Sequence, residues 1–180
     1  QSLTSTIGVG LYIIILVLVF ALYLYTYRRK LLDGLRHVLF FSILMALVIT
    51  TAFVVLRHVP IGYIFLIPFA WVPIITRVFY DSRTAIFIHL ITVLIVSIAA
   101  PAPYIFILLQ VITGVVAVIS LRDMTQRAQL AQTALFILLM YSVLYTATTM
   151  LVTGSIMNVE YRYYLYFAIN AVLVICAYGL

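Results

Sequence analysis

Charged side chains are scarce in this sequence. Asp, Glu, Lys and Arg together make up 8% of the 180 residues, whereas 67% of the residues are hydrophobic. Soluble domains carry roughly a quarter charged residues, so a water-soluble fold would have too little polar surface to cover itself. Cys176 is the only cysteine, which excludes an internal disulfide and a thiolate metal cluster. The composition, with a mean hydropathy of +1.30, therefore predicts an integral membrane protein.

Several motifs of membrane-bound enzymes are also absent. The sequence contains no His-Glu-x-x-His zinc motif and no Gly-x-Ser-x-Gly nucleophile motif. Tyr80-Asp81 resembles half of an intramembrane aspartyl site, but no second aspartate lies inside an apolar stretch. The one lysine, Lys30, lies at the end of such a stretch, which excludes a retinal Schiff base. We therefore expect no catalytic residue, no bound metal and no cofactor in this chain.

Long apolar stretches make up most of the chain. Each is about as long as a helix that crosses the hydrocarbon core of a bilayer, which takes about 20 residues. A strand of a membrane barrel would instead alternate polar and apolar residues over about 10 positions. We predict an all-α membrane protein, a seven-transmembrane helix bundle in which 1–180 form a single transmembrane domain. The predicted spans cover residues 7–27, 38–56, 61–79, 84–100, 104–121, 128–152 and 163–180.

Two features leave the organisation of the chain partly open. The spans at 38–56 and 61–79, joined near Arg57, could form one re-entrant unit. The number of transmembrane spans would then be five, and each terminus of the chain would stay on the same side of the membrane. The first residues lack the charged leader of a signal peptide, and the last span runs to Leu180 without a polar tail. We therefore expect this domain to be a fragment of a longer protein.

Basic residues are distributed unevenly between the loops. Eight lie on one side of the predicted bundle and two on the other, and this positive-inside bias makes the first side cytoplasmic. The N-terminus is then outside and the C-terminus in the cytoplasm. The net charge of +6 lies in short clusters between apolar stretches, which indicates anionic lipid rather than nucleic acid as the partner. The eight residues are Arg28, Arg29, Lys30, Arg36, Arg77, Arg83, Arg122 and Arg127, and the two are Arg57 and Arg162.

Polar and helix-breaking residues inside spans are the first candidates for function. His89, Gln110 and Asn170 each lie well inside a predicted span. They could form hydrogen bonds between helices, or they could contact a ligand, and His89 could also sense protons or bind a metal. Pro68 and Pro73 should kink the span at 61–79, either as a hinge or as a fixed bend.

Each predicted cytoplasmic loop combines basic residues with one acid. These residues could form local ion pairs, each worth little at a surface, or together form a docking face for a cytoplasmic domain. The candidates for this coupling role are Asp33, Asp81, Arg83, Arg122, Asp123 and Arg127.

The central part of the chain resembles a known family of membrane receptors. Its third span contains Ile-Pro-Phe-Ala, its fourth begins with Thr-Ala after a short basic turn, and its fifth contains Gly-Val-Val-Ala before an arginine-rich turn. This pattern resembles the seven-helix membrane part of bacterial HD-hydrolase receptors, the PgpH-type cyclic di-AMP phosphodiesterases. The resemblance implies a protein of the bacterial plasma membrane, with an extracytoplasmic sensor domain before the bundle and a metal-dependent cytoplasmic HD phosphodiesterase after it. The sequence has no His-Asp dipeptide, so no catalytic or metal-binding role carries over to a residue here.

Two functions follow as hypotheses. The first is a signal-transmitting membrane domain that anchors and regulates the cytoplasmic hydrolase. The alternative is a transporter or binding protein for a small molecule or a lipid, which requires a polar pocket near His89, Gln110 and Asn170. The sequence has no internal repeat of the kind from which many transporters are built, and whether the bundle forms a homo-oligomer remains open.

Overall fold

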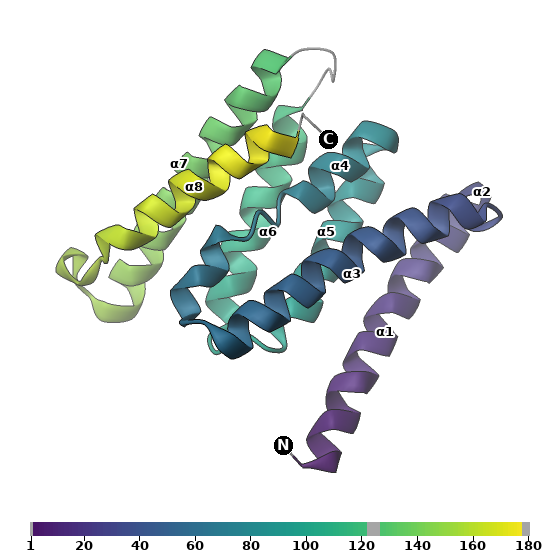
Figure 1. Cartoon of the computed structure of the whole chain (residues 1–180), viewed down its shortest axis with the longest axis horizontal. Helices are drawn as coiled ribbons and strands as arrows, with labels where there is room; N and C mark the ends of the chain where they lie inside the picture. The colour runs from purple at the N-terminus through teal and green to yellow at the C-terminus, as the bar shows by residue number, and fades with distance from the viewer. Residues whose placement is uncertain (1, 122–126, 178–180) are drawn as a thin grey trace.

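The computed structural model describes residues 2–121 and 127–177, and every regular element in these ranges is a helix (Figure 1). The elements confirm the predicted all-α class. In chain order they are α1 (Leu3–Tyr27), α2 (Arg29–Leu32), α3 (Leu35–His58), the 3-10 helix η1 (Ile61–Leu66), α4 (Trp71–Phe79), α5 (Ser82–Ser97), α6 (Pro103–Ser120), α7 (Arg127–Thr153), the 3-10 helix η2 (Ile156–Asn158) and α8 (Tyr161–Cys176).

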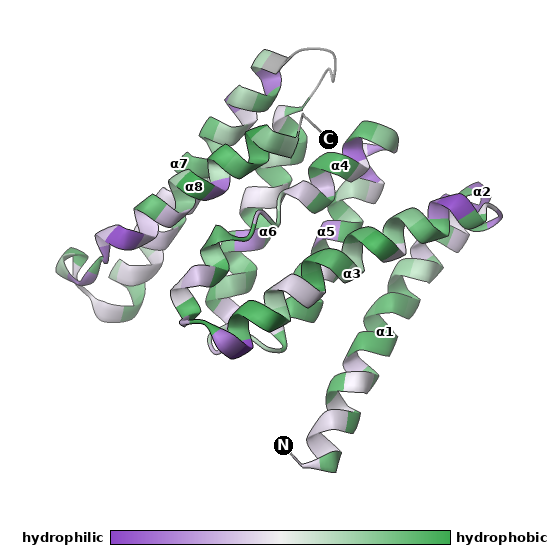
Figure 2. Cartoon of the chain, viewed as in Figure 1, coloured by the Kyte–Doolittle hydropathy of each residue, from purple (hydrophilic) through white to green (hydrophobic). Residues whose placement is uncertain are grey.

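Five helical segments among the described residues are long and apolar enough to cross a membrane. They are α1, α3, the segment 61–79 that contains η1 and α4, α6, and residues 128–153 of α7. Helices α5 and α8 are also apolar but have 16 residues each. The helices consist largely of hydrophobic residues (Figure 2), and many of these are exposed, such as Leu18 and Leu22 of α1, each more than 60% exposed. Such a surface is stable in lipid but not in water.

Helix α5 occupies the centre of the bundle. It contacts α1, α3, α4 and α6, whereas α6, α7 and α8 continue the bundle on the side away from α1 (Figure 1). The buried side chains form two apolar clusters, one mainly of α1, α3 and α5 and the other mainly of α6, α7 and α8. The third span belongs to both, because Phe69 packs in the first cluster and Ala70 in the second.

The third span is broken, not merely kinked as the sequence suggested. Helix η1 ends at Leu66 and α4 begins at Trp71. Pro68 lies in the gap and has no backbone N–H to donate, and the N–H of Phe69 donates instead to the carbonyl of Ile67, at 2.9 Å. Pro73 lies in the first turn of α4, where backbone N–H groups lack helical partners in any case. Pro73 therefore removes no helical hydrogen bond, and the break lies at Pro68.

Candidate functional site: buried polar contacts between helices

His89 connects α5 to α6. Its side chain is 1% exposed, and its Nε2 lies 2.7 Å from the backbone carbonyl oxygen of Gln110. Because a carbonyl only accepts hydrogen bonds, Nε2 carries the proton and Nδ1 is an acceptor. The imidazole fits because Gly114 has no side chain: a Cβ at that position would lie 2.0 Å from Nε2. His89 thus lies directly against the backbone of α6.

Gln110 connects α6 to α7. The hydroxyl of Tyr141 donates to its Oε1 at 2.5 Å, and both side chains are buried. The ring of Tyr141 stacks on Phe167 of α8, with 5.1 Å between the ring centroids. Sequence reasoning missed Tyr141, since tyrosines in a membrane protein are expected mainly at the two interfaces. Its position in the middle of the predicted span at 128–152 was the available signal.

Asn170 connects α8 to the break in the third span. Its Nδ2 donates to the carbonyl oxygens of Phe65 and Ile67, at 2.8 and 2.9 Å. These carbonyls flank the end of η1, where Pro68 interrupts the helical bonding. In a bilayer, a buried carbonyl without a donor costs free energy, so the last helix of the bundle stabilises the break.

The three polar residues predicted from the sequence therefore belong to one path of contacts. It runs from His89 through Gln110, Tyr141 and Phe167 to Asn170, which lies one turn after Phe167 on α8. The path joins α5, α6, α7 and α8 to the broken third span. All of these residues are at most 1% exposed.

Several atoms along this path have unused hydrogen-bonding capacity. Within the described residues, His89 Nδ1, Gln110 Nε2 and Asn170 Oδ1 are buried without a partner. A buried unpaired polar atom is unfavourable. Each of these atoms can form a further bond without the loss of an existing one. The described residues contain no group of three or more His, Cys, Asp or Glu side chains placed to hold a metal ion.

A second polar cluster joins helix ends on the side of the basic loops. Asp81 accepts hydrogen bonds from the backbone N–H and the hydroxyl of Thr84, and so caps α5. Arg28 Nε lies 3.5 Å from Asp81 Oδ1, and the hydroxyl of Tyr23 is 3.0 Å from that of Thr84. Burial alone would raise the pKa of Asp81, but the bonds from Thr84 and the charge of Arg28 outweigh it and lower this pKa. The cluster ties the end of α1 to the start of α5.

Two other residues proposed for cytoplasmic coupling, Arg83 and Asp33, are more peripheral. Arg83 is exposed, and its guanidinium carbon lies 5.7 Å from the ring centroid of Tyr27. Asp33 is exposed at the end of α2. Arg122 and Asp123 lie outside the described residues, as does the side chain of Arg127 at the start of α7. Among the candidates whose side chains the structure describes, Asp81 alone lies within the cluster.

Comparison with known proteins gives one result. The model of a family described as "7TM receptor with intracellular HD hydrolase" matches residues 3–180, almost the whole chain. No curated protein matches the chain, and no solved structure does.

Proposed function

This chain belongs to the family of seven-transmembrane receptors with an intracellular HD hydrolase, and we propose that it regulates an HD phosphodiesterase that cleaves cyclic di-AMP. As the receptor part of such a protein, the chain is a membrane sensor and signalling domain. In the proposal, an extracytoplasmic domain of the same protein supplies the signal. The HD domain contains the metal-dependent chemistry, and no residue of the bundle takes part in hydrolysis.

The observation that carries the proposal is the contact between α8 and the break in the third span. Regulation requires a bundle with two arrangements that a ligand binds unequally. A broken helix is the kind of element that can shift without the loss of a complete helical ladder. Because Asn170 holds the carbonyls of Phe65 and Ile67, a movement at the break would displace α8, the last helix of the bundle.

The proposed orientation has the basic loops and the end of α8 in the cytoplasm of a bacterium, with the N-terminus outside. The positive-inside bias supports this orientation. The contact between Arg28 and Asp81 adds support, because it puts the loops after α1 and after α4 on the same side of the bundle. Displacement of α8 would then reach the HD domain that we propose to follow it.

Transport of a small molecule or lipid is the alternative. His89, Gln110 and Asn170 would have to line a polar pocket, but each is at most 1% exposed and pairs with a neighbouring helix. These contacts favour a role in joining helices. Hydrolysis and solute uptake can both be measured on the same proteoliposomes, so one experiment distinguishes the two functions.

The test uses the full-length protein in proteoliposomes. We expect it to hydrolyse cyclic di-AMP faster than cyclic di-GMP and to accumulate neither inside the vesicles. Preference for cyclic di-GMP would contradict the assigned substrate. Uptake of solute without hydrolysis of either nucleotide would contradict the whole proposal and support the transporter. A variant of the HD domain without its His-Asp dipeptide is the control for contaminating phosphodiesterases.

A further inference from the structure

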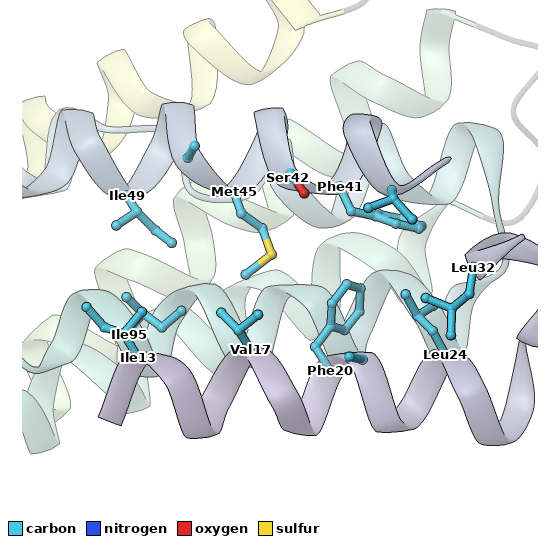
Figure 3. A pocket seen from close by; sticks show the side chains of 13 residues that line it. Ile13, Val17, Phe20, Leu24, Leu32, Phe41, Ser42, Met45, Ile49 and Ile95 are labelled. Atoms are coloured by element: carbon cyan, nitrogen blue, oxygen red, sulfur yellow. The ribbon is translucent and has the colours of Figure 1, made fainter. Parts of the chain in front are cut away.

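An apolar groove runs between α1 and α3 (Figure 3). Ile13 and Val17 of α1 face Met45 and Ile49 of α3 across it, and Ile95 of α5 contributes to its wall. The groove has a volume of about 350 Å³. Ser42 is the only lining residue with a polar side chain. Nothing in this lining selects a polar or charged ligand, so an occupant must be a hydrocarbon or another apolar surface.

The length of the groove matches one leaflet of a bilayer. Its lining on α1 extends from Ile13 to Leu24, which at 1.5 Å per residue is about 16 Å. Half the hydrocarbon core of a bilayer is about 15 Å thick. Leu24 lies one turn before the end of α1 at Tyr27, so the groove runs from the middle of the membrane to the surface at which α1 ends.

The volume of the groove fits a single hydrocarbon chain better than a helix. A helix about 10 Å in diameter would occupy on the order of 1,300 Å³ over this length. A hydrocarbon chain about 5 Å across, as carbon contact distances imply, would occupy roughly 320 Å³. The groove is therefore the right size for an acyl chain and too small to enclose a helix.

The positive charge near one end of the groove favours a lipid with an anionic headgroup. Leu32 and Val38 line this end. Leu32 belongs to the segment 28–36, which connects α1 to the first turn of α3 and contains Arg28, Arg29, Lys30 and Arg36. Arg28 pairs with Asp81. Within the described ranges, no carboxylate forms an ion pair with Lys30 or Arg36. Asp33 is the only acid in this turn, so the turn has a net positive charge that favours an anionic lipid.

We propose that the groove between α1 and α3 binds one acyl chain of an anionic phospholipid, whose phosphate contacts the basic turn at residues 28–36. The assignment to the cytoplasmic leaflet rests on the proposed orientation. The binding itself does not, because a lipid can enter from a bilayer whichever side the turn faces. A failure to bind lipid would not contradict the proposed regulation of the hydrolase. Equally, a failure to regulate the hydrolase would not contradict lipid binding in the groove.

The test measures phospholipid retained by the full-length protein. The protein is released from nanodiscs that contain equal amounts of phosphatidylglycerol and phosphatidylcholine, and bound lipid is counted by native mass spectrometry. Ala46→Trp fills the groove, because Ala46 lines it. Leu47→Trp is the matched control, since Leu47 is 60% exposed and lies outside the lining. We expect the affinity for phosphatidylglycerol to fall about tenfold in the first variant only.

A second variant, on the opposite wall of the groove, distinguishes a loss of lipid binding from misfolding of Ala46→Trp. Ala21 also lines the groove, whereas its neighbour Leu22 is 62% exposed and does not. Ala21→Phe should lower phosphatidylglycerol retention as Ala46→Trp does, and Leu22→Phe should not. Lys30→Gln and Arg36→Gln should each reduce the preference for phosphatidylglycerol over phosphatidylcholine by about fivefold.

Three results would overturn the proposal. Equal retention of phosphatidylglycerol in all four groove and control variants would show that the lipid binds elsewhere. A dimer that is lost only in Ala46→Trp and Ala21→Phe would show that a second copy of the chain occupies the groove. No retained lipid in the unsubstituted full-length protein would show that another segment of the protein fills it.

Discussion

The side-chain amide of Asn170 donates a hydrogen bond to the carbonyl oxygen of Ile67, 103 positions earlier in the chain. This bond and its neighbour to Phe65 connect the last helix of the bundle to the point where the third span is broken. The same helix contacts α7 through the stacked rings of Phe167 and Tyr141. The stability of the break and the position of α8 are therefore coupled.

Loss of the Asn170 amide should destabilise the bundle. Asn170→Leu keeps the branched shape of the side chain but leaves the two carbonyls without this donor. We expect the free energy of unfolding in mixed detergent and SDS micelles to fall by about 1–3 kcal/mol. Val172→Leu is the control on the same helix, because Val172 is 59% exposed and should leave the free energy unchanged. Equal stability of both variants would contradict the role assigned to the amide.

A side chain at position 114 should force α5 and α6 apart. Gly114→Ala would bring a Cβ to 2.0 Å from His89 Nε2, so we expect a loss of about 1–3 kcal/mol in the free energy of unfolding. Gly10→Ala is the control, because a Cβ there meets no other atom within 4 Å. The double variant His89→Ala/Gly114→Ala should lose less than the sum of its single variants. Strict additivity would show that His89 and Gly114 do not share this space.

Removal of the Tyr141 hydroxyl should cost less than removal of a whole buried side chain. Tyr141→Phe leaves Gln110 Oε1 without its donor, and we expect a loss of about 1 kcal/mol, as for other hydrogen bonds between membrane helices. Tyr104→Phe serves as the control, since Tyr104 is 65% exposed. The double variant Gln110→Leu/Tyr141→Phe lacks both partners and so leaves neither one unpaired. Its loss in the free energy of unfolding should therefore be smaller than the sum of the losses in the two single variants.

Acid should weaken the cluster around Asp81. The pKa of Asp81 is lowered in the folded protein by Thr84 and Arg28, against the effect of burial. Its contribution is therefore fully present above the ordinary pKa of an aspartate and is lost as the pH falls through the lowered value. The side chain is 37% exposed, so solvent screening limits the effect to no more than about 1 kcal/mol.

Asp81→Asn isolates this charge, because asparagine caps a helix about as well as aspartate. Between pH 7 and pH 3, the unsubstituted protein should lose more free energy of unfolding than Asp81→Asn does. Arg28→Gln should reduce the difference between them. An identical acid dependence of the unsubstituted protein and Asp81→Asn would mean that the ion pair contributes nothing to stability.

The sequence was informative about the separate helices and much less so about their contacts. Apolar run lengths predicted the class of the fold, and their polar residues His89, Gln110 and Asn170 all proved to be buried. The sequence does not reveal that Asn170 would reach the carbonyls of Phe65 and Ile67, because these lie 105 and 103 positions away and are freed only by the break at Pro68. Backbone carbonyls leave no pattern in a sequence.

The most direct test of the central claim measures hydrolysis of cyclic di-AMP by the full-length protein in nanodiscs. Three forms are compared: the unsubstituted protein, Asn170→Leu, and Val172→Leu as the lipid-facing control. Because coupling free energies between sites are about 1–3 kcal/mol, the account predicts that Asn170→Leu changes the rate by about fivefold or more, while Val172→Leu leaves it unchanged. The same rate in all three forms, with Asn170→Leu still folded, would show that the bundle anchors the hydrolase without regulating it.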